Sequence, residues 1–282
     1  MCDNIRLNNI AIIGLGLMGG SFGLALKKYN LCDKVLGVDH NISHQKDALE
    51  LGLVDEIVEL EDIKNADMIV LAVPVDGIIS ISKQLINISN HTTIIDFGGT
   101  KEKIVNSIPI EIRSNFVASH PMCGTEKFGP TASLSGLYEG KTIVLCDVEA
   151  NDKIHLQKTE NIFTAIEMDI VKMSAKEHDI HACYMSHLPH AISFSLANIV
   201  MNHENPKDII SLAAGGFKDM SRVAKSSPWM WSDIFRQNRT NLLDSIDVFE
   251  RELVLAKNML ENEQYDDLHK WMSKANTLHD IL

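Results

Sequence analysis

The sequence predicts an α/β protein in two parts, an N-terminal doubly wound sheet followed by an all-helical domain. Three observations lead to this fold class. The chain opens with a strand, a glycine turn and a helix; apolar runs then alternate with helical segments; and beyond about residue 150 helical periodicity takes over. At 282 residues the chain is long enough for two separate cores. We therefore expect a boundary between residues 1–150 and 151–282.

The first strand and helix carry a dinucleotide-binding pattern. Residues 9–14 (NIAIIG) are β-branched and end in glycine, and helical spacing follows. Gly14, Gly16 and Gly19 form G-x-G-x-x-G, and Asp39 ends the next strand about 20 residues later. The glycines permit a tight turn, close approach of a pyrophosphate and packing of the helix against the strand. A structural glycine turn is the alternative, but the full context favours a Rossmann-type site. Asp39 would repel a 2′-phosphate, so we expect NAD rather than NADP.

The next apolar runs continue the sheet. They cover residues 66–76, 92–101, 115–127 and 140–147, and the first is almost continuously apolar, as in a buried parallel strand. Ligands of open α/β sheets lie outside the carboxyl ends of the strands. Pro74, residues 98–101 and His120 are therefore expected around the nicotinamide.

The second part of the chain shows helix signals. Ser174 and Glu177 have capping-box spacing, and Pro189 is expected to kink the helix that follows. Ser227 and Pro228 resemble an N-cap and first residue of a long helix, with an apolar stripe formed by Leu242, Ile246, Phe249, Leu253, Ala256 and Leu260. Such a stripe is typical of a core, but it also suits a homodimer interface.

Composition limits the partners. A net charge of −12 disfavours nucleic acid and anionic membranes, and an anionic small substrate would need a local group of cations. No run approaches the roughly 18 apolar residues of a membrane span, and five scattered cysteines without CxxC spacing predict neither disulfides nor a zinc site. These features predict a cytoplasmic protein without a bound metal.

Two clusters of the helical part have the residue types of a binding site. His178, His181, His187 and His190 lie close together in sequence, with Ser186 one turn before His190. A metal site, ordinary helix histidines and contacts to a substrate anion are the three interpretations. Farther on, Lys218 and Arg222 would share a helix face, either as a solvated basic surface or as a carboxylate clamp.

Four motifs in order make the chain resemble the prephenate dehydrogenase family, which includes arogenate and cyclohexadienyl dehydrogenases. They are GLGLMGGS, SHPMCGTEKFG, SHLPHAISFSLA and GGFKDMSRVAKSSPWMWSDI, and the resemblance covers essentially the whole chain. The first motif is shared with other dehydrogenases, whereas the last three together are specific. The resemblance is to the monofunctional form, without a fused mutase or regulatory domain.

The resemblance implies roles for individual residues. His120 is implied as the catalytic histidine, beside an NAD site formed by Gly14, Gly16, Leu17, Met18, Gly19, Asp39, Val73, Pro74 and Gly98. The implied substrate-binding residues are Ser186, His187, His190, Lys218, Arg222 and Trp231, with Glu126 and Asp219 near the pocket entrance. Relatives often carry a serine where this chain has Gly99. Thr100 or a water is expected to replace the missing hydroxyl.

The implied reaction is oxidation and decarboxylation of a cyclohexadienol, prephenate or arogenate, in tyrosine biosynthesis. His120 would accept the proton of the ring hydroxyl, a role that requires a neutral imidazole. The rival hypotheses are a β-hydroxyacid or imine dehydrogenase, which would carry a catalytic lysine where this chain has SHLPH, and an NAD-binding protein without turnover. The sequence alone leaves the preference between the two substrates, tyrosine feedback and the oligomer open.

Overall fold

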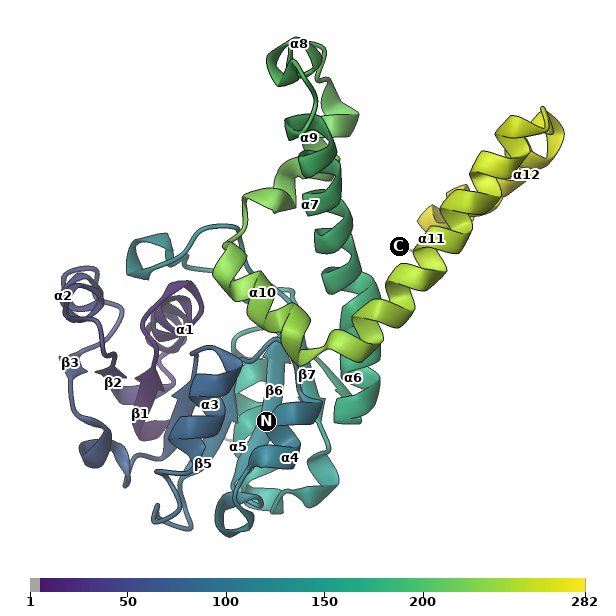
Figure 1. Ribbon diagram of the computed structural model, residues 1–282. Coiled ribbons are helices and arrows are strands. Elements are labelled where there is room, and N and C mark those ends of the chain that lie inside the picture. The colour runs from purple at the N-terminus through teal and green to yellow at the C-terminus, as the bar shows by residue number, and fades with distance from the viewer. Residues whose placement is uncertain (1–5, 282) are drawn as a thin grey trace.

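The computed structural model describes residues 6–281 and shows one sheet with a helical part standing on its edge (Figure 1). The sheet has the order β3-β2-β1-β4-β5-β6-β7-β8, and all neighbouring strands are parallel except β6 and β7, which are antiparallel. The strands are β1 (Leu7–Ile13), β2 (Cys32–Val38), β3 (Glu56–Ile57), β4 (Met68–Leu71), β5 (Thr93–Asp96), β6 (Phe116–Pro121), β7 (Thr142–Cys146) and β8 (Asp169–Met173). The predicted doubly wound fold is confirmed.

Helices cover both faces of the sheet. On one face α1 (Leu17–Lys28), α2 (Ile42–Glu50) and α5 (Lys153–Ala165) pack over Ile10 and Ile12. On the other face α3 (Val75–Ser82), α4 (Glu102–Ser107) and the start of α6 (Ala175–Ala182) pack over Ala11 and Ile13. Alternate residues of a strand point to opposite faces, so β1 serves both cores. Short 3₁₀ turns complete this part at Leu60–Ile63, Ile110–Ile112, Pro130–Ala132 and Val148–Ala150.

The expectation that strands end near residue 150 is corrected by the structure. α5 packs on the sheet, and β8 pairs with β7 in parallel, so the sheet unit extends to Met173. β8 is an edge strand in which Asp169, Val171 and Lys172 are exposed, and it therefore lacks the apolar run of the inner strands. The helical part begins at α6, after the predicted capping box of Ser174 and Glu177, which is present.

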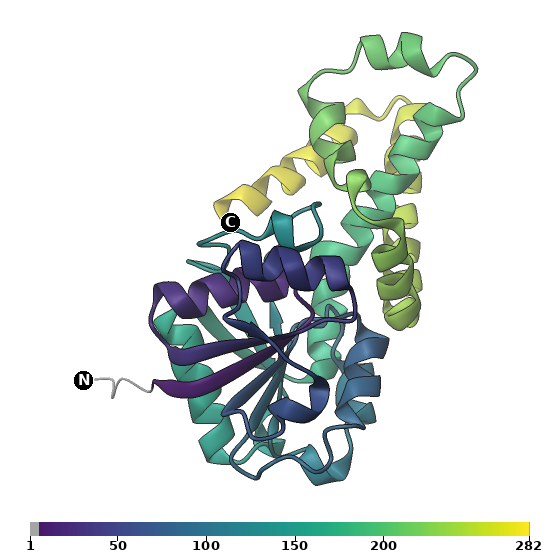
Figure 2. The same cartoon turned by 90° about the vertical axis from the view of Figure 1, so that its left-hand side faces the viewer.

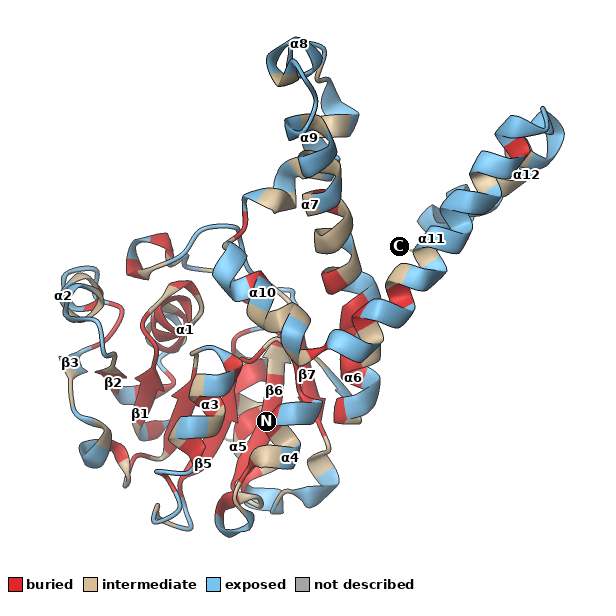
Figure 3. Ribbon diagram, viewed as in Figure 1, coloured by how far each residue is buried: buried red, intermediate tan, exposed pale blue. Residues whose placement is uncertain are grey.

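The helical part forms two arms (Figures 1 and 2). One arm contains α6, α7 (Leu188–Met201), α8 (Pro206–Ser211) and α9 (Gly215–Ser221), and the 3₁₀ turn Arg222–Lys225 leads from it to α10 (Pro228–Gln237). The other arm contains α11 (Arg239–Glu261) and α12 (Tyr265–Asn276), followed by the 3₁₀ turn Thr277–Asp280. The core lies in the sheet unit, while the arms are mainly exposed (Figure 3). Among the described residues, no helix combines the length and the apolar character needed to cross a membrane.

Two helix predictions are refined by the structure. Pro189 does not simply kink a continuous helix, because a π-helical segment, Cys183–His187, joins α6 to α7 with the proline in the first turn of α7. Proline lacks an N–H and cannot continue an α-helical ladder at this point, which accounts for the change of hydrogen-bond spacing. Ser227 caps α10 as predicted, but the expected long helix breaks at Asn238 into α10 and α11.

Candidate active site

The glycine turn after β1 leaves room for a phosphate group. Gly14 has φ +94°, and a Cβ added there would meet the Ala72 carbonyl oxygen at 2.5 Å, so this position requires glycine. A Cβ on Gly16 would meet nothing within 4 Å, and Gly16 is the N-cap of α1 without any side-chain cap. The N–H groups of Leu17, Met18 and Gly19 open this helix, and free N–H groups at a helix N-terminus suit a pyrophosphate.

Asp39 stands at the end of β2 in a fixed orientation. Its two carboxylate oxygens accept hydrogen bonds from the backbone N–H groups of Leu15 and Asn41, both at 2.9 Å. The first contact ties the acid to the glycine turn. Val73 borders the same turn, since its Cγ1 would lie 2.7 Å from a Cβ on Gly14, and Pro74 follows as the N-cap of α3. These residues therefore fit the dinucleotide that the sequence predicts.

A buried ion pair lies beneath the carboxyl edge of the sheet. Lys101 and Asp96 are both fully buried, and their side chains are paired. The Lys101 ammonium also donates to the carbonyl oxygen of Ser119 at 2.6 Å, while the Ser119 hydroxyl donates to the backbone carbonyl of Asp96 at 2.6 Å. These contacts fix the loop after β5 against the residue that precedes His120. Of residues 98–101, Lys101 is thereby joined to the neighbour of His120, and the place of the whole loop around the nicotinamide stays a prediction.

His120 begins a hydrogen-bonded relay that the sequence analysis missed. Its Nδ1 lies 2.8 Å from Nε2 of His178, and Nδ1 of His178 lies 2.8 Å from Oδ1 of Asp179. The Asp179 carboxylate also accepts from the backbone N–H groups of Lys101 (2.7 Å) and Glu102 (3.0 Å). His120 comes from β6, whereas His178 and Asp179 come from α6, so the relay joins the two parts of the chain.

The relay determines which nitrogen of His120 is basic. The carboxylate of Asp179 only accepts hydrogen bonds, so His178 carries its proton on Nδ1 and presents Nε2 as an acceptor. His120 must then donate from Nδ1, which leaves the lone pair on its Nε2. The only signal in the sequence was the pair His178–Asp179 directly after a capping box, and this signal does not identify a partner on another element.

Both histidines of the relay favour the neutral form. Burial lowers the pKa of His120 well below its usual range, and the nearby His178, Lys101 and His187 lower this pKa further. Burial also lowers the pKa of His178, against the opposing effect of the Asp179 carboxylate. Neutral His120 is the form that a general base requires at neutral pH.

A second set of contacts extends the site along the helical part. Asn238, at the break between α10 and α11, donates from Nδ2 to the Asp179 backbone carbonyl (2.7 Å) and lies 3.1 Å from Nδ1 of His187. The rings of His187 and Trp231 pack in a T-shaped arrangement with their centroids 6.1 Å apart. Burial lowers the pKa of His187 to about 4. His190 stacks on Trp231 with ring centroids 3.5 Å apart. The buried Asn238 was not predicted as a site residue.

One surface ion network also links the two parts beside the site. Asp76, in the first turn of α3, accepts from Arg236 Nη2 at 2.5 Å and from Gln237 Nε2 at 2.9 Å, both on α10. Lys103 on α4 donates to the same carboxylate at 3.0 Å. Hydrogen bonds, first from Arg236 and then from Lys103 and Gln237, lower the pKa of Asp76 to about 2. The helix that carries Trp231 is thus tied to the helix that follows Pro74.

The loop at Gly99 has space for a side chain. Gly99 is partly exposed, and a Cβ added there would lie 3.8 Å from Cδ1 of Ile234, an ordinary contact. Thr100 is fully buried, and its hydroxyl has no hydrogen-bond partner among the described residues. Gly98 is closely enclosed, because a Cβ there would lie 2.5 Å from Ile104 Cδ1. A replacement of the missing serine hydroxyl by Thr100 stays a prediction.

The remaining predicted substrate-binding residues differ in how they contact the site. Ser186 is in the site, since its carbonyl oxygen lies 2.8 Å from His190 Nδ1. Arg222 is exposed but near enough for its charge to lower the pKa of His190, after the larger effect of burial. Glu126, Lys218 and Asp219 are exposed, and within residues 6–281 no hydrogen bond or ion pair joins their side chains to the site.

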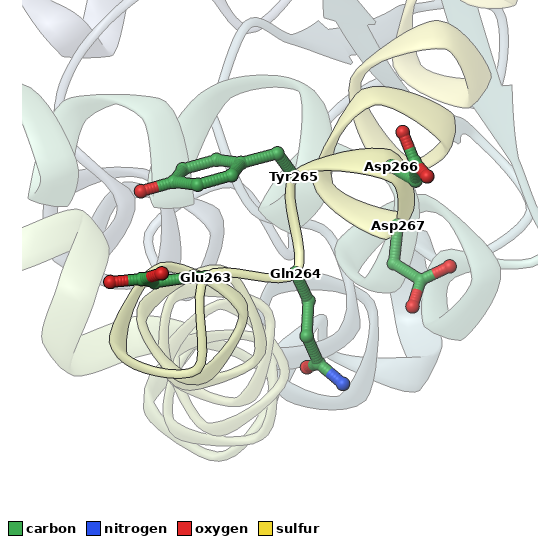
Figure 4. Close-up of a pocket in the computed structure, with 5 residues that line it drawn as sticks. All are labelled: Glu263, Gln264, Tyr265, Asp266 and Asp267. Carbon is green, nitrogen blue, oxygen red and sulfur yellow. The ribbon is translucent and has the colours of Figure 1, made fainter.

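Other candidate sites do not match this chemistry. Across residues 6–281 no group of three or more histidine, cysteine or acidic side chains is placed to hold a metal ion. A hollow of about 330 Å³ lies at the turn between α11 and α12, lined by Glu263, Gln264, Tyr265, Asp266 and Asp267 (Figure 4). It is at the outer end of an arm (Figure 1), away from the carboxyl edge of the sheet.

Two family models match the chain. The model described as "Prephenate dehydrogenase, nucleotide-binding domain" matches residues 22–172, and the model described as "Prephenate dehydrogenase, dimerization domain" matches residues 174–274. The two matches meet where the sheet unit ends and α6 begins. Together they cover both parts of the fold.

Known proteins resemble the chain over nearly its whole length. Prephenate dehydrogenase of Bacillus subtilis (strain 168) is 32% identical over 286 residues, which cover 99% of this chain and 77% of the relative. Cyclohexadienyl dehydrogenase of Zymomonas mobilis is 30% identical and covers 97% of this chain and 98% of the relative. The crystal structure of A. aeolicus prephenate dehydrogenase in complex with hydroxyphenyl propionate and NAD+ has a TM-score of 0.91 and 33% identity, and covers 97% of this chain and 98% of that one.

Proposed function

The chain belongs to the prephenate dehydrogenase family, and we propose that His120 is the base with which it carries out the family's reaction. The protein is an NAD-dependent oxidoreductase that converts prephenate to 4-hydroxyphenylpyruvate and carbon dioxide in tyrosine biosynthesis. The observation that carries the role of His120 is the relay through His178 to Asp179, which leaves Nε2 of His120 free to accept a proton.

The cofactor would be held at the glycine turn. Leu17, Met18 and Gly19 would bind the pyrophosphate with their N–H groups, the fixed Asp39 carboxylate would accept from a ribose hydroxyl, and Val73, Pro74 and Gly98 would border the nicotinamide. When bound, NAD supplies the hydride acceptor for the ring carbon that bears the hydroxyl. The side chains of the protein would carry out the proton transfers and bind the substrate.

His120 would accept one proton from the substrate hydroxyl and later return it to the phenolate oxygen of the product. Its Nε2 takes the proton of the substrate hydroxyl as that carbon is oxidised, and the imidazolium is stabilised through His178 by Asp179. Cleavage of the bond between the ring and its carboxylate releases carbon dioxide, and the electron pair of this bond makes the ring aromatic. The phenolate oxygen then takes the proton back from His120, so no net proton is consumed.

The substrate would lie between β6 and the helical part. Arg222 and Lys218 are the cations that we assign to its carboxylates, and Ser186, His187, His190 and Trp231 are the residues that we assign to its walls. Gly99 and Thr100 would border the ring hydroxyl, and Glu126 and Asp219 the entrance. The chain has SHLPH where a β-hydroxyacid dehydrogenase would carry its catalytic lysine, which supports this assignment over that rival.

The helical part would also form a homodimer. α11 leaves large apolar side chains exposed, among them Leu253 and Val254, each with 54% of its surface accessible. A matching region described as a dimerization domain supports pairing through these helices. We further propose a cytoplasmic location, which rests on the composition of the chain.

Replacement of His120 by alanine tests the proposed base. Positioned general-base catalysis typically contributes about 10² to 10⁴ in rate, so kcat with prephenate should fall by that factor. The dissociation constant for NAD should change little, because the glycine turn is untouched. His181, an exposed histidine of α6, provides the matched control in His181→Ala. An unchanged kcat in His120→Ala would remove the histidine from the mechanism.

A further inference from the structure

A network of charged and polar side chains joins the start of α3 to the end of α10. The Asp76 carboxylate accepts from Arg236 Nη2 at 2.5 Å and from Gln237 Nε2 at 2.9 Å. Lys103 of α4 donates to it at 3.0 Å, and Arg236 is also paired with Asp233, one turn earlier on α10. An isolated exposed ion pair contributes little to stability, whereas several charges that share partners can hold a fixed geometry.

The charges of this network suit the helix ends on which they lie. Asp76 is in the first turn of α3, and Arg236 is in the last turn of α10. An acid at a helix N-terminus and a base at a helix C-terminus are both favoured by the helix dipole. Hydrogen bonds to Asp76 and then to Asp233 raise the pKa of Arg236. The pair between Asp76 and Arg236 is therefore fully charged at neutral pH.

α10 has little apolar contact with which to fix its position. Among the residues of this helix, all of which the structure describes, Trp231 alone is buried, and Trp229 is 88% exposed. Helices of globular proteins are usually held by the packing of a whole apolar face. We therefore expect the place of α10 to depend on polar contacts near its end, which are those of Asn238 to α6 and those of Arg236 to Asp76.

The network connects the cofactor side of the candidate site with its substrate side. Asp76 is two residues beyond Pro74, the N-cap of α3 beside the glycine turn. On α10, Ile234 faces the loop after β5, because its Cδ1 lies 3.8 Å from a Cβ built on Gly99. Trp231 is on the same helix, one turn before Phe235. A shift of α10 would therefore move Trp231 relative to the carboxyl edge of the sheet.

We propose that Asp76 and Arg236 are positioning residues whose ion pair holds α10, and with it Trp231, against the carboxyl edge of the sheet. This rests on the proposed function, in which Trp231 forms a wall of the substrate pocket. The two residues act through α10 and not on the reacting atoms. Loss of the pair should weaken the binding of prephenate and leave the chemical step at His120 unchanged.

The first test separates KM from kcat. In Asp76→Asn at saturating NAD, KM for prephenate should rise about fivefold, at the lower end of the coupling between linked sites, while kcat stays within about twofold. A loss of folded protein would instead lower the apparent kcat and leave KM unchanged. Glu56→Gln is the matched control, because it breaks an exposed ion pair with Lys34 between β2 and β3, and it should leave KM unchanged.

A double-mutant cycle tests whether the two residues act as one pair. Arg236→Gln should raise KM for prephenate by the same factor as Asp76→Asn. The double variant should add little to either single change, because one interaction cannot be lost twice. Arg236→Lys keeps the positive charge and should recover most of the wild-type KM.

Hydrogen exchange followed by mass spectrometry tests the position of α10 without turnover. Amides of α10 should exchange about fivefold faster in Asp76→Asn, because the lost contact favours local opening of the helix. Amides of α5, which packs on the sheet far along the chain from this network, should exchange as in the wild-type protein. Addition of NAD should slow the exchange of α10 in the wild-type protein, and this slowing should be lost in Asp76→Asn.

Four results would each overturn the proposal. They are a wild-type KM in Asp76→Asn, an equal rise of KM in Glu56→Gln, independent effects in the double-mutant cycle, and unchanged exchange of α10. Failure of the proposed function is a different outcome. If prephenate does not reduce NAD with the wild-type protein, that function fails, and the exchange of α10 still decides whether the ion pair positions the helix.

Discussion

At the scale of single residues, the position of one proton on each histidine carries most of the chemistry. Asp179 holds the proton of His178 on Nδ1, and His178 in turn holds that of His120 on Nδ1. Each member therefore presents one acceptor and one donor in a fixed order. A side chain of similar size but different hydrogen-bonding character breaks this order without opening a cavity.

Asp179→Asn is the most direct test of the relay. The amide oxygen of asparagine can still accept from His178 Nδ1 and from the Lys101 N–H, but an amide carries no negative charge to stabilise the imidazolium that His120 forms. We expect kcat to fall by about 10² or more, within the range that general-base catalysis supplies, while KM for NAD stays within about twofold. Thermal unfolding of the variant separates this effect from lost stability, since Asp179 also accepts from the backbone of Lys101 and Glu102. Wild-type kcat in a folded Asp179→Asn protein would show that the relay is not used.

The pH dependence of kcat follows from the pKa of His120. The neutral base is the active form, and burial holds its pKa well below the ordinary value of about 6.5. Activity at saturating prephenate should therefore persist as the pH falls from 8 to 6.5 and should decline only at lower pH. The measurement is a pH profile of initial rates with enzyme stability checked at each pH. A half-maximal point at or above pH 6.5 would contradict the assignment.

At the scale of elements, the breaks in helices matter more than the helices themselves. The π-helical segment Cys183–His187 turns His187 inward, where it is buried, and the interruption at Asn238 directs an amide toward Asp179 and His187. Both irregular points lie within the site. In uninterrupted helices, the side chains of His187 and Asn238 would point away from the site.

Asn238→Ala should therefore destabilise the protein and impair catalysis together. The change leaves the Asp179 carbonyl and His187 Nδ1 without their partner, and an unpaired buried polar group costs about 1 to 3 kcal/mol. Denaturant unfolding measures this loss in the free energy of unfolding. Asn262→Ala is the matched control, because its amide bonds the Asn258 carbonyl on an exposed helix end, and it should cost less than about 0.5 kcal/mol. Equal losses in the two variants would argue against a special role for Asn238.

The sequence predicts the cofactor half of the site better than the substrate half. Gly14, Gly16 and Asp39 act through local backbone geometry within one strand–helix–strand unit, so their spacing is informative. Asp179 and Asn238 act through contacts between distant segments, which no local pattern encodes. The sequence pattern did not reveal β8 for a related reason, because an edge strand with mostly exposed residues lacks the apolar run of a buried strand.

At the scale of the whole molecule, the arms expose apolar side chains that no other described part of the chain covers. Leu243, Val248, Leu253, Val254, Leu255 and Leu260 are all exposed on α11, and the sheet unit has no comparable series on one helix among its described residues. Apolar surface on this scale is typical of a face that pairs with a partner. The predicted stripe is thus only partly core: Leu242 is buried, while Leu253 and Leu260 are exposed.

Leu253→Glu should weaken the proposed homodimer. A carboxylate placed within an apolar interface must lose its hydration, so we expect the apparent mass in sedimentation to fall toward that of one 31.4 kDa chain. Ile42→Glu is the control, since Ile42 is 80% exposed on α2 of the sheet unit, and it should leave the mass unchanged. A wild-type protein that sediments as a monomer would contradict the proposed dimer.

The relay crosses from the sheet unit to the helical part, and this limits which chimeras with another dehydrogenase would keep an oriented base. The base stands on β6, but the acid that orients it arrives on α6, after the last strand of the sheet. A chimera that joins this sheet to the helices of another dehydrogenase would inherit the cofactor site intact. It would acquire a working base only if the incoming first helix brought a histidine and an acid in the same register. The sheet unit and the first helix of the helical part must therefore be kept together if the base is to remain oriented.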